Sequence, residues 1–199
     1  MIIKAKKYFG QNFLINETIS KKIVLGLDVG KNEQIIEIGP GKGALTKFLI
    51  EKYEHIKLVE IDFDCVIFLK KKFQNIDVIH DDFLTVTNEK IQFKNYSIIG
   101  NFPYNVSSQI LFKILENRDH ISQVVGMFQK EVADRICSNS KSKKYGILSV
   151  LIQAYFNCEQ LFDVAPENFR PKPKINSSVI RLKRNSVKKL NCNHNQDPS

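Results

Sequence analysis

Short apolar runs typical of β-strands alternate with runs of helical spacing along most of this 199-residue sequence. In the helical runs, apolar residues recur three and four positions apart, as they do on one face of an α-helix. This repeated change of period is typical of an α/β protein with a doubly wound, mainly parallel sheet. The strands predicted in the first two thirds are 34–38, 56–61, 77–80, 97–100 and 123–128.

The last third of the chain departs from this alternation. Helices are predicted at 130–136 and 146–153, whereas 154–164 fits either a helix end or a strand. Three of the six prolines fall in 165–174, which predicts a loop. Residues 177–182 alternate as a half-buried strand does, and we expect them to close the sheet.

The length of the chain allows a sizeable core without disulfides or a bound metal. We expect one domain over residues 1–184 and a polar, disordered tail over 185–199. The four cysteines form no C-x-x-C pair and the four histidines are scattered, so no metal site is predicted. No apolar run suits a signal peptide or a membrane span, so we expect a reduced, cytoplasmic protein without membrane contact.

The positive charge of the chain is concentrated at its two ends, although the formal net charge is only +9. Residues 1–25 hold five Lys against one Glu, and residues 170–199 hold eight basic residues against one Asp. This distribution favours a localised nucleic-acid footprint over a charge that serves solubility alone. The cations expected to contact phosphate are Lys4, Lys6, Lys7, Arg170, Lys172 and Lys174.

A glycine-rich loop directly follows the first predicted strand. Gly39, Gly41 and Gly43 stand within five residues, before a helical run. Glycines there let the backbone approach a ligand, and the amino end of a helix presents free amides to it. A tight structural turn would use one glycine, so we interpret this loop as a ligand site. Its spacing fits both a nicotinamide dinucleotide and S-adenosylmethionine.

Acidic side chains follow the next two strands, at the sheet edge where doubly wound proteins bind ligands. Glu60 stands where a carboxylate can accept hydrogen bonds from both hydroxyls of an adenosine ribose. The alternative is a surface acid at a strand end. Asp82 can accept from an adenine amino group, or Asp81 or Asp82 can cap a local helix.

The Asn-Phe-Pro-Tyr segment at 101–104 distinguishes between the two possible cofactors. A base amino group is a poor nucleophile because its lone pair is delocalised into the ring. The Asn101 oxygen and a backbone carbonyl before Pro103 can draw its hydrogens out of the ring plane, while Tyr104 stacks on the base. An Asn-Pro turn beside a buried Tyr has the same sequence. Nicotinamide chemistry does not use such a set, so the segment favours methyl transfer through positioning and electrostatics, without a general base.

Seven segments together resemble one known family, the ribosomal RNA adenine dimethyltransferases of the KsgA type. They occur in the order of that family, and the resemblance runs from about residue 6 to residue 184. The segments are GQNFL at 10–14, EIGPGKG at 37–43, VEID at 59–62, NFPYN at 101–105, QKEVADRI at 129–136, YGILS at 145–149 and FRPKPK at 169–174. An ordered set of this kind is far more specific than a shared fold.

The resemblance implies a fold, a cofactor and a reaction. The fold is the Rossmann-like fold of class I methyltransferases, with a mainly parallel seven-stranded sheet and helices on both faces. Members of the family move two methyl groups from S-adenosylmethionine, which becomes S-adenosylhomocysteine, to each of two adjacent adenosines near the 3′ end of small-subunit ribosomal RNA. The implied partner is this RNA or a pre-30S particle, and we expect the chain to act as a monomer.

The same resemblance assigns site residues motif by motif. The residues that would hold the target adenine are Asn101, Phe102, Pro103 and Tyr104. Phe169 would offer a second stacking face, unless it simply belongs to the core. The residues that would line the cofactor site are Asn12, Leu14, Gly39, Gly41, Glu60, Ile61, Asp82 and Asn101.

Three alternatives remain open at this point. Methyltransferases that modify large-subunit RNA and confer antibiotic resistance share the segments at 101–104 and 169–174, but they usually begin SQNF and lack the segment at 129–136. A ribosome-assembly factor with the same fold need not be catalytic. A nicotinamide oxidoreductase would need a hydride-transfer site, which the sequence does not supply. The family also continues into a small helical domain absent from this sequence, so we expect a catalytic domain alone.

Overall fold

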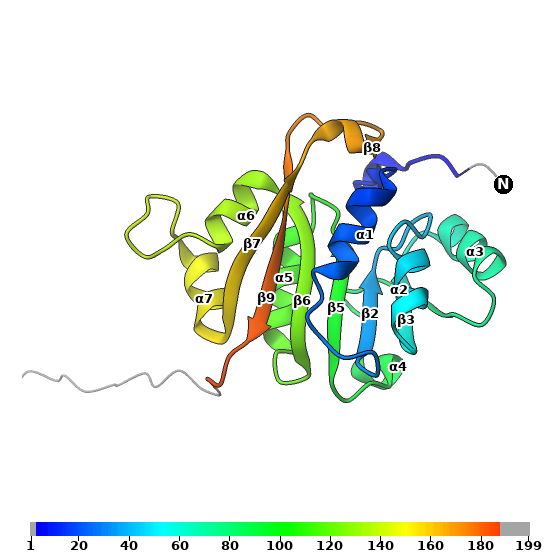
Figure 1. Cartoon of the computed structure of the whole chain (residues 1–199), viewed down its shortest axis with the longest axis horizontal. Coiled ribbons are helices and arrows are strands. Elements are labelled where there is room, and N and C mark those ends of the chain that lie inside the picture. The colour runs from blue at the N-terminus through cyan, green and yellow to red at the C-terminus, as the bar shows by residue number, and fades with distance from the viewer. Residues whose placement is uncertain (1–2, 188–199) are drawn as a thin grey trace, which may run out of the picture.

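The computed structural model describes residues 3–187, which contain a seven-stranded sheet with helices on both faces (Figure 1). The strand order is β4-β3-β2-β5-β6-β9-β7. Its first five strands are parallel, and β9 runs antiparallel to both β6 and β7. The mainly parallel sheet predicted from the sequence is thus confirmed. The strands are β2 (Gln34–Ile38), β3 (His55–Glu60), β4 (Asp77–His80), β5 (Tyr96–Asn101), β6 (Ile121–Gln129), β7 (Phe156–Val164) and β9 (Ser177–Arg184).

Helices cover both faces because the parallel strands carry apolar residues on both sides. In β2, the neighbours Ile35 and Ile36 point to opposite faces, and both are fully buried. Ile35 packs in a core with α1 and α2, and Ile36 packs in a larger core with α5, α6 and α7. The helices are α1 (Glu17–Leu25), α2 (Thr46–Lys52), α3 (Phe63–Lys72), α4 (Asn88–Ile91), α5 (Ser107–Glu116), α6 (Lys130–Ile136) and α7 (Ile147–Tyr155).

The order of the strands reverses between β2 and β5. From β2 the chain adds β3 and β4 on one side, and it later adds β5 and β6 on the other. Doubly wound sheets bind ligands outside the carboxyl ends of their strands at such a point. The glycine loop follows β2, and Asn101 is the last residue of β5. The fold therefore brings both predicted ligand segments to one crevice.

A second, two-stranded sheet joins an amino-terminal segment to the proline-rich segment beside this crevice. Strand β1 (Phe13–Leu14) pairs antiparallel with β8 (Phe169–Arg170). The side-chain nitrogen of Asn16 donates to the side-chain oxygen of Asn168, 152 positions later, at 2.8 Å. The prediction of an uninterrupted loop in the proline-rich segment is therefore wrong, because β8 and the 3-10 helix η2 (Pro166–Asn168) lie within it. Local composition cannot reveal a strand whose partner is so distant in sequence.

The segment that fitted either a helix end or a strand is resolved as a strand. Helix α7 ends at Tyr155, and β7 begins at Phe156 and pairs with β9 along its length. The tail predicted to be disordered lies almost entirely outside the described residues. Among residues 3–187, no helix has both the length and the apolar character needed to cross a membrane.

Candidate active site

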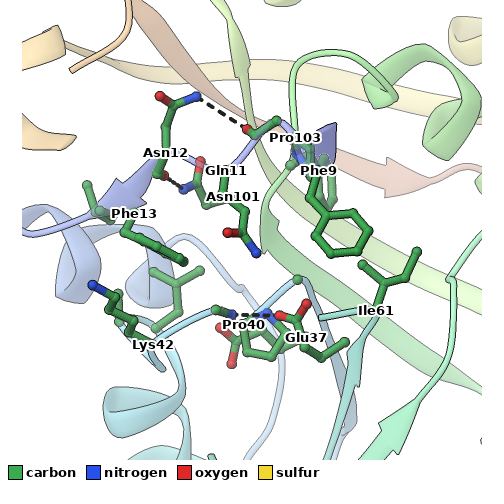
Figure 2. A pocket seen from close by; sticks show the side chains of 18 of the residues that line it. Phe9, Gln11, Asn12, Phe13, Glu37, Pro40, Lys42, Ile61, Asn101 and Pro103 are labelled. Carbon is green, nitrogen blue, oxygen red and sulfur yellow. Dashed lines mark hydrogen bonds between the residues drawn. The ribbon is translucent and has the colours of Figure 1, made fainter. Parts of the chain in front are cut away.

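Two adjacent cavities open at the carboxyl ends of β2, β3 and β5. The residues Phe9, Gly39, Ile61 and Pro103 line both cavities, which therefore form one continuous cleft. Figure 2 shows the first cavity, of about 80 Å³, and Asp82 lies on the second, of about 220 Å³. The other predicted residues that line the first cavity are Asn12, Leu14, Gly41, Glu60, Asn101, Phe102 and Tyr104. The fold thus gathers every predicted cofactor and adenine residue except Phe169 along one cleft.

The glycine loop approaches the cleft with its backbone. Gly39 and Gly41 have φ of 62° and 54°, in the left-handed region that favours glycine. A side chain at Gly39 would meet no atom within 4 Å, so the backbone there faces open space that a ligand can occupy. Gly43 has a different role, because a Cβ there would lie 2.4 Å from the Phe73 ring. Helix α2 begins at Thr46, three residues after Gly43.

Glu60 is buried at the end of β3 with 3% of its surface exposed. One carboxylate oxygen accepts from the amide of Gly41 at 2.9 Å, and the other accepts from the amide of Asp62 at 2.9 Å. Burial raises the pKa of Glu60, and these amide hydrogen bonds oppose the rise. Both oxygens keep a further lone pair, because an ionised carboxylate has about four acceptor sites. The carboxylate is therefore oriented by the backbone and can still accept from a ligand.

Asp82 lies in a turn at the second cavity and caps no α-helix, because α4 begins only at Asn88. Its Oδ1 accepts from the amide of Leu84 at 2.9 Å, which fixes the turn after β4. Its Oδ2 has no hydrogen-bond partner among the described residues, and the residue lines the second cavity. Asp81 instead pairs with Lys90 at 2.5 Å. The local turn thus holds the Asp82 carboxylate at the wall of the cleft.

Asn101 has its side chain fixed by the amino-terminal segment. Its Nδ2 donates to the backbone carbonyl of Asn12 at 2.9 Å, a bond drawn in Figure 2. Because this bond uses the nitrogen, the Oδ1 atom remains without a partner within residues 3–187. The arrangement leaves a free acceptor at the end of β5, in a residue that lines the first cavity.

Phe102 lines the first cavity, but its ring points away from it into the core. The ring is 1% exposed and packs edge-on against Phe128, with ring centroids 5.1 Å apart. Gly100 and Gly126 leave the space that this ring fills. The Phe102 carbonyl, which precedes Pro103, is the group of this residue that remains available to a base.

Phe169 also differs from its predicted role. The side chain is fully buried and packs in the same core as Leu14. The two residues stand opposite each other in the β1–β8 pair. Its ring therefore offers no free stacking face. The alternative noted from the sequence, a core residue, is what the structure shows.

The two basic segments of the chain lie together because β1 pairs with β8. Lys6 is an exception among the predicted phosphate contacts, because its ammonium pairs with Asp62 at 2.5 Å and Asp64 at 2.7 Å. Lys172 pairs with Glu167 at 2.7 Å. The predicted contacts that are exposed and have no ion-pair partner among the described residues are Lys4, Lys7, Arg170 and Lys174.

The pairing of Lys6 belongs to a network that the sequence did not reveal. The Asp62 side chain is completely buried, and it accepts hydrogen bonds from Lys6 and, at 2.8 Å, from Gln11. Burial alone would raise the pKa of Asp62, but these donors hold it below its usual range. The backbone amide of Lys6 donates to the Gln11 oxygen at 2.8 Å and closes the network. It fastens the amino-terminal segment over the cleft.

Glu37 is a second residue to which the sequence analysis gave no role. It lines the first cavity with 1% of its surface exposed, and the hydroxyl of Thr46 donates to it at 2.6 Å. Burial raises the pKa of Glu37 to about 8, and the nearby Glu60 carboxylate adds to the rise. An acid inside the apolar run Gln34–Ile38 was a visible signal of such a buried carboxyl.

The sheet and the cleft together define a class I methyltransferase. The sequence model of the family described as "Ribosomal RNA adenine dimethylase" matches residues 2–194, and the chain belongs to this family. A protein of Cytophaga hutchinsonii named "Ribosomal RNA small subunit methyltransferase A" is 47% identical over 198 residues, which cover 98% of this chain and 77% of the relative. A protein of Flavobacterium johnsoniae with the same name is 46% identical, over 96% of this chain and 74% of the relative.

Solved structures give the same fold. A dimethyladenosine transferase from Plasmodium falciparum superposes with a TM-score of 0.79 and 26% identity, over 87% of this chain and 63% of that chain. The 23S rRNA methyltransferase ErmE also gives a TM-score of 0.79, with 27% identity, over 88% of this chain and 70% of that chain. Structures with different names thus match this fold equally well, so the fold alone does not identify the RNA, whereas both sequence relatives above are named for the small subunit.

Proposed function

We propose that this protein transfers methyl groups from S-adenosylmethionine to the amino groups of two adjacent adenosines near the 3′ end of small-subunit ribosomal RNA. The observation that carries the proposal is the Asn101 side chain, whose nitrogen is held by Asn12 and whose oxygen stays free at the cleft. The relatives from C. hutchinsonii and F. johnsoniae are both named as small-subunit enzymes, which supports small-subunit RNA as the substrate.

The residues of the cleft fit S-adenosylmethionine. This cofactor supplies an electrophilic methyl group on a positively charged sulfur. Gly39 has open space beside its backbone that a ligand can occupy, and Leu14 of β1 lines the first cavity. Glu60 would accept from the ribose hydroxyls with the lone pairs that its two amide partners leave free. Asp82 would accept from the adenine amino group with Oδ2.

The segment at 101–104 would prepare the target adenine. Asn101 Oδ1 and the Phe102 carbonyl would accept the two hydrogens of the amino group and so turn its lone pair toward the methyl group. The Tyr104 ring would stack on the base, an interaction that contributes about 1–3 kcal/mol. No general base is needed, because the product ammonium can lose its proton to water. The protein contributes positioning and electrostatics.

The basic segments joined by β1 and β8 would bind the RNA backbone beside the cleft. Arg170 stands opposite Phe13, which lines the first cavity, so the paired segments border the cleft. We propose small-subunit ribosomal RNA or a pre-30S particle as the partner, with residues 1–184 as a monomeric catalytic domain. This substrate agrees with the cytoplasmic location predicted from the sequence.

The test is transfer of labelled methyl groups to small-subunit RNA or particles that lack this modification, followed by nucleoside analysis for N6,N6-dimethyladenosine. Asn101→Ala should lower the rate about 100-fold, because it removes an acceptor aimed at the reacting group. Asn157→Ala, which changes an exposed Asn of β7, should keep the wild-type rate. Label confined to large-subunit RNA would assign the chain to the resistance-conferring enzymes. Particle binding without any label would indicate an assembly factor.

A further inference from the structure

Ser177 contacts the proposed adenine site from a strand that has had no role in it so far. It is the first residue of β9, and none of its surface is exposed. Its hydroxyl lies 2.5 Å from the phenol oxygen of Tyr104, 73 positions earlier in the chain. Among the described residues, Tyr104 is the one side-chain hydrogen-bond partner of this hydroxyl. Loss of the bond would leave a buried polar group unsatisfied.

The backbone of Ser177 is held on both sides, whereas that of Tyr104 is not. Ser177 pairs with Gln129 of β6 and with Val164 of β7. Tyr104 lies in a turn between β5 and α5. The sheet can therefore act as a fixed support for the far end of the phenol ring. The bond opposes a swing of the ring about its first side-chain torsion, χ1, which would carry the phenol oxygen away from Ser177.

We infer that Ser177 is a positioning residue that, through its hydrogen bond to Tyr104, holds in place the ring that stacks on the target adenine. The inference rests on the proposed function. Stacking requires the two rings to lie close together, and a ring free to swing about χ1 would lie against the base for only part of the time. Burial raises the pKa of Tyr104, so the phenol keeps its proton and can donate it to Ser177.

Ser178 offers a matched control in the same strand. It is also fully buried, but successive side chains of a strand point to opposite faces. On that other face, Gln160 donates to the Ser178 hydroxyl at 2.9 Å, and this hydroxyl donates to the carbonyl of Phe162 at 3.3 Å. Ser178→Ala therefore removes the same group from the same strand without a contact to Tyr104.

The experiment compares steady-state methylation of small-subunit RNA by the wild type and by single and double variants. Ser177→Ala and Tyr104→Phe should each lower kcat/KM for RNA roughly five- to tenfold, the loss expected for one hydrogen bond. The double variant should be no slower than Tyr104→Phe, because both changes break the same bond. Ser178→Ala should keep kcat/KM for RNA within about twofold of the wild type. Cofactor affinity, measured by calorimetry, should also stay within about twofold of the wild type in every variant.

A second readout reports the stacking itself. RNA that carries 2-aminopurine in place of the target adenosine should lose fluorescence on the wild type, because stacking quenches the base, and lose less on Ser177→Ala. Should Ser177→Ala fail to fold by thermal unfolding, Tyr104→Phe tests the same bond from the loop. Additive losses in the double variant, or an equal loss in Ser178→Ala, would overturn the inference. A wild type that modifies no small-subunit RNA would overturn the proposed function instead.

Discussion

Glu37 should make the protein less stable as the pH rises from about 5 to about 8, and Glu37→Gln should remove this dependence. The folded chain keeps the Glu37 proton up to about pH 8, whereas an exposed carboxyl releases it near pH 4.5. Stability increases with pH only where the unfolded chain binds more protons. Here the folded chain binds more of them, so between these two values the unfolding free energy falls as the pH rises.

The size of the effect follows from the two pKa values of Glu37. Each pH unit between them changes the unfolding free energy by about 1.4 kcal/mol. From pH 5 to pH 8 the loss amounts to about 3 to 4 kcal/mol, after allowance for incomplete titration at both limits. Gln retains the acceptor that the Thr46 hydroxyl uses at 2.6 Å, and it cannot ionise. The variant should therefore gain stability over the wild type progressively as the pH rises.

The assay is urea unfolding of both proteins at pH 5, 6, 7 and 8. All other titrating groups are common to the two, so the difference between their unfolding free energies isolates Glu37. Glu51→Gln, an exposed glutamate of α2, controls for the loss of one negative charge. Parallel curves for wild type and Glu37→Gln would refute the reasoning, because they would mean that folding leaves the Glu37 carboxyl at its ordinary pKa.

Three further predictions test other parts of the structure. Gly126→Ala should destabilise the fold by about 1–3 kcal/mol in urea unfolding, because the new Cβ would lie 2.4 Å from the Phe102 ring. Gly30→Ala is the control and should leave the unfolding free energy unchanged, because its Cβ would meet no atom within 4 Å. Asp62→Asn should break the ion pair with Lys6 and so loosen the amino-terminal segment. Calorimetry should then show weaker cofactor binding, and limited proteolysis should show faster cleavage before β1. An unchanged affinity and an unchanged cleavage rate would disprove the proposal that the pair fastens this segment. RNA affinity should fall with salt at a logarithmic slope of about −3, as expected for four phosphate contacts, and a flat response would show that the basic segments only solvate the protein.

The fold could be predicted from the sequence largely because its signals are local. The strand at Gln34–Ile38 is a continuous apolar run between turn residues, and such a run in an alternating pattern indicates a parallel strand buried on both faces. The cleft followed from the same pattern, because Gly39, Glu60 and Asn101 stand where parallel strands end. Helical spacing also located α6, whose observed bounds are Lys130–Ile136.

The contacts between distant segments could not be predicted in the same way. The bonds from Lys6 to Asp62 and from Tyr104 to Ser177 join residues 56 and 73 positions apart, and nothing in local spacing specifies them. The direction of a side chain in a loop is equally hidden. Phe102 was placed against the adenine because of its position in a motif, but two neighbouring glycines open the core to its ring.

The place of β9 in the sheet has a consequence for how the chain folds during synthesis. Among the strands of residues 3–187, β9 is the last to leave the ribosome, yet it lies between β6 and β7 and supplies the sheet pairing of β7. A nascent chain can therefore assemble its five parallel strands first, while the open edge of β6 and the unpaired β7 await the arrival of β9. Because Ser177 begins that strand and β8 immediately precedes it, the proposed catalytic centre would be completed in the same final step as the sheet.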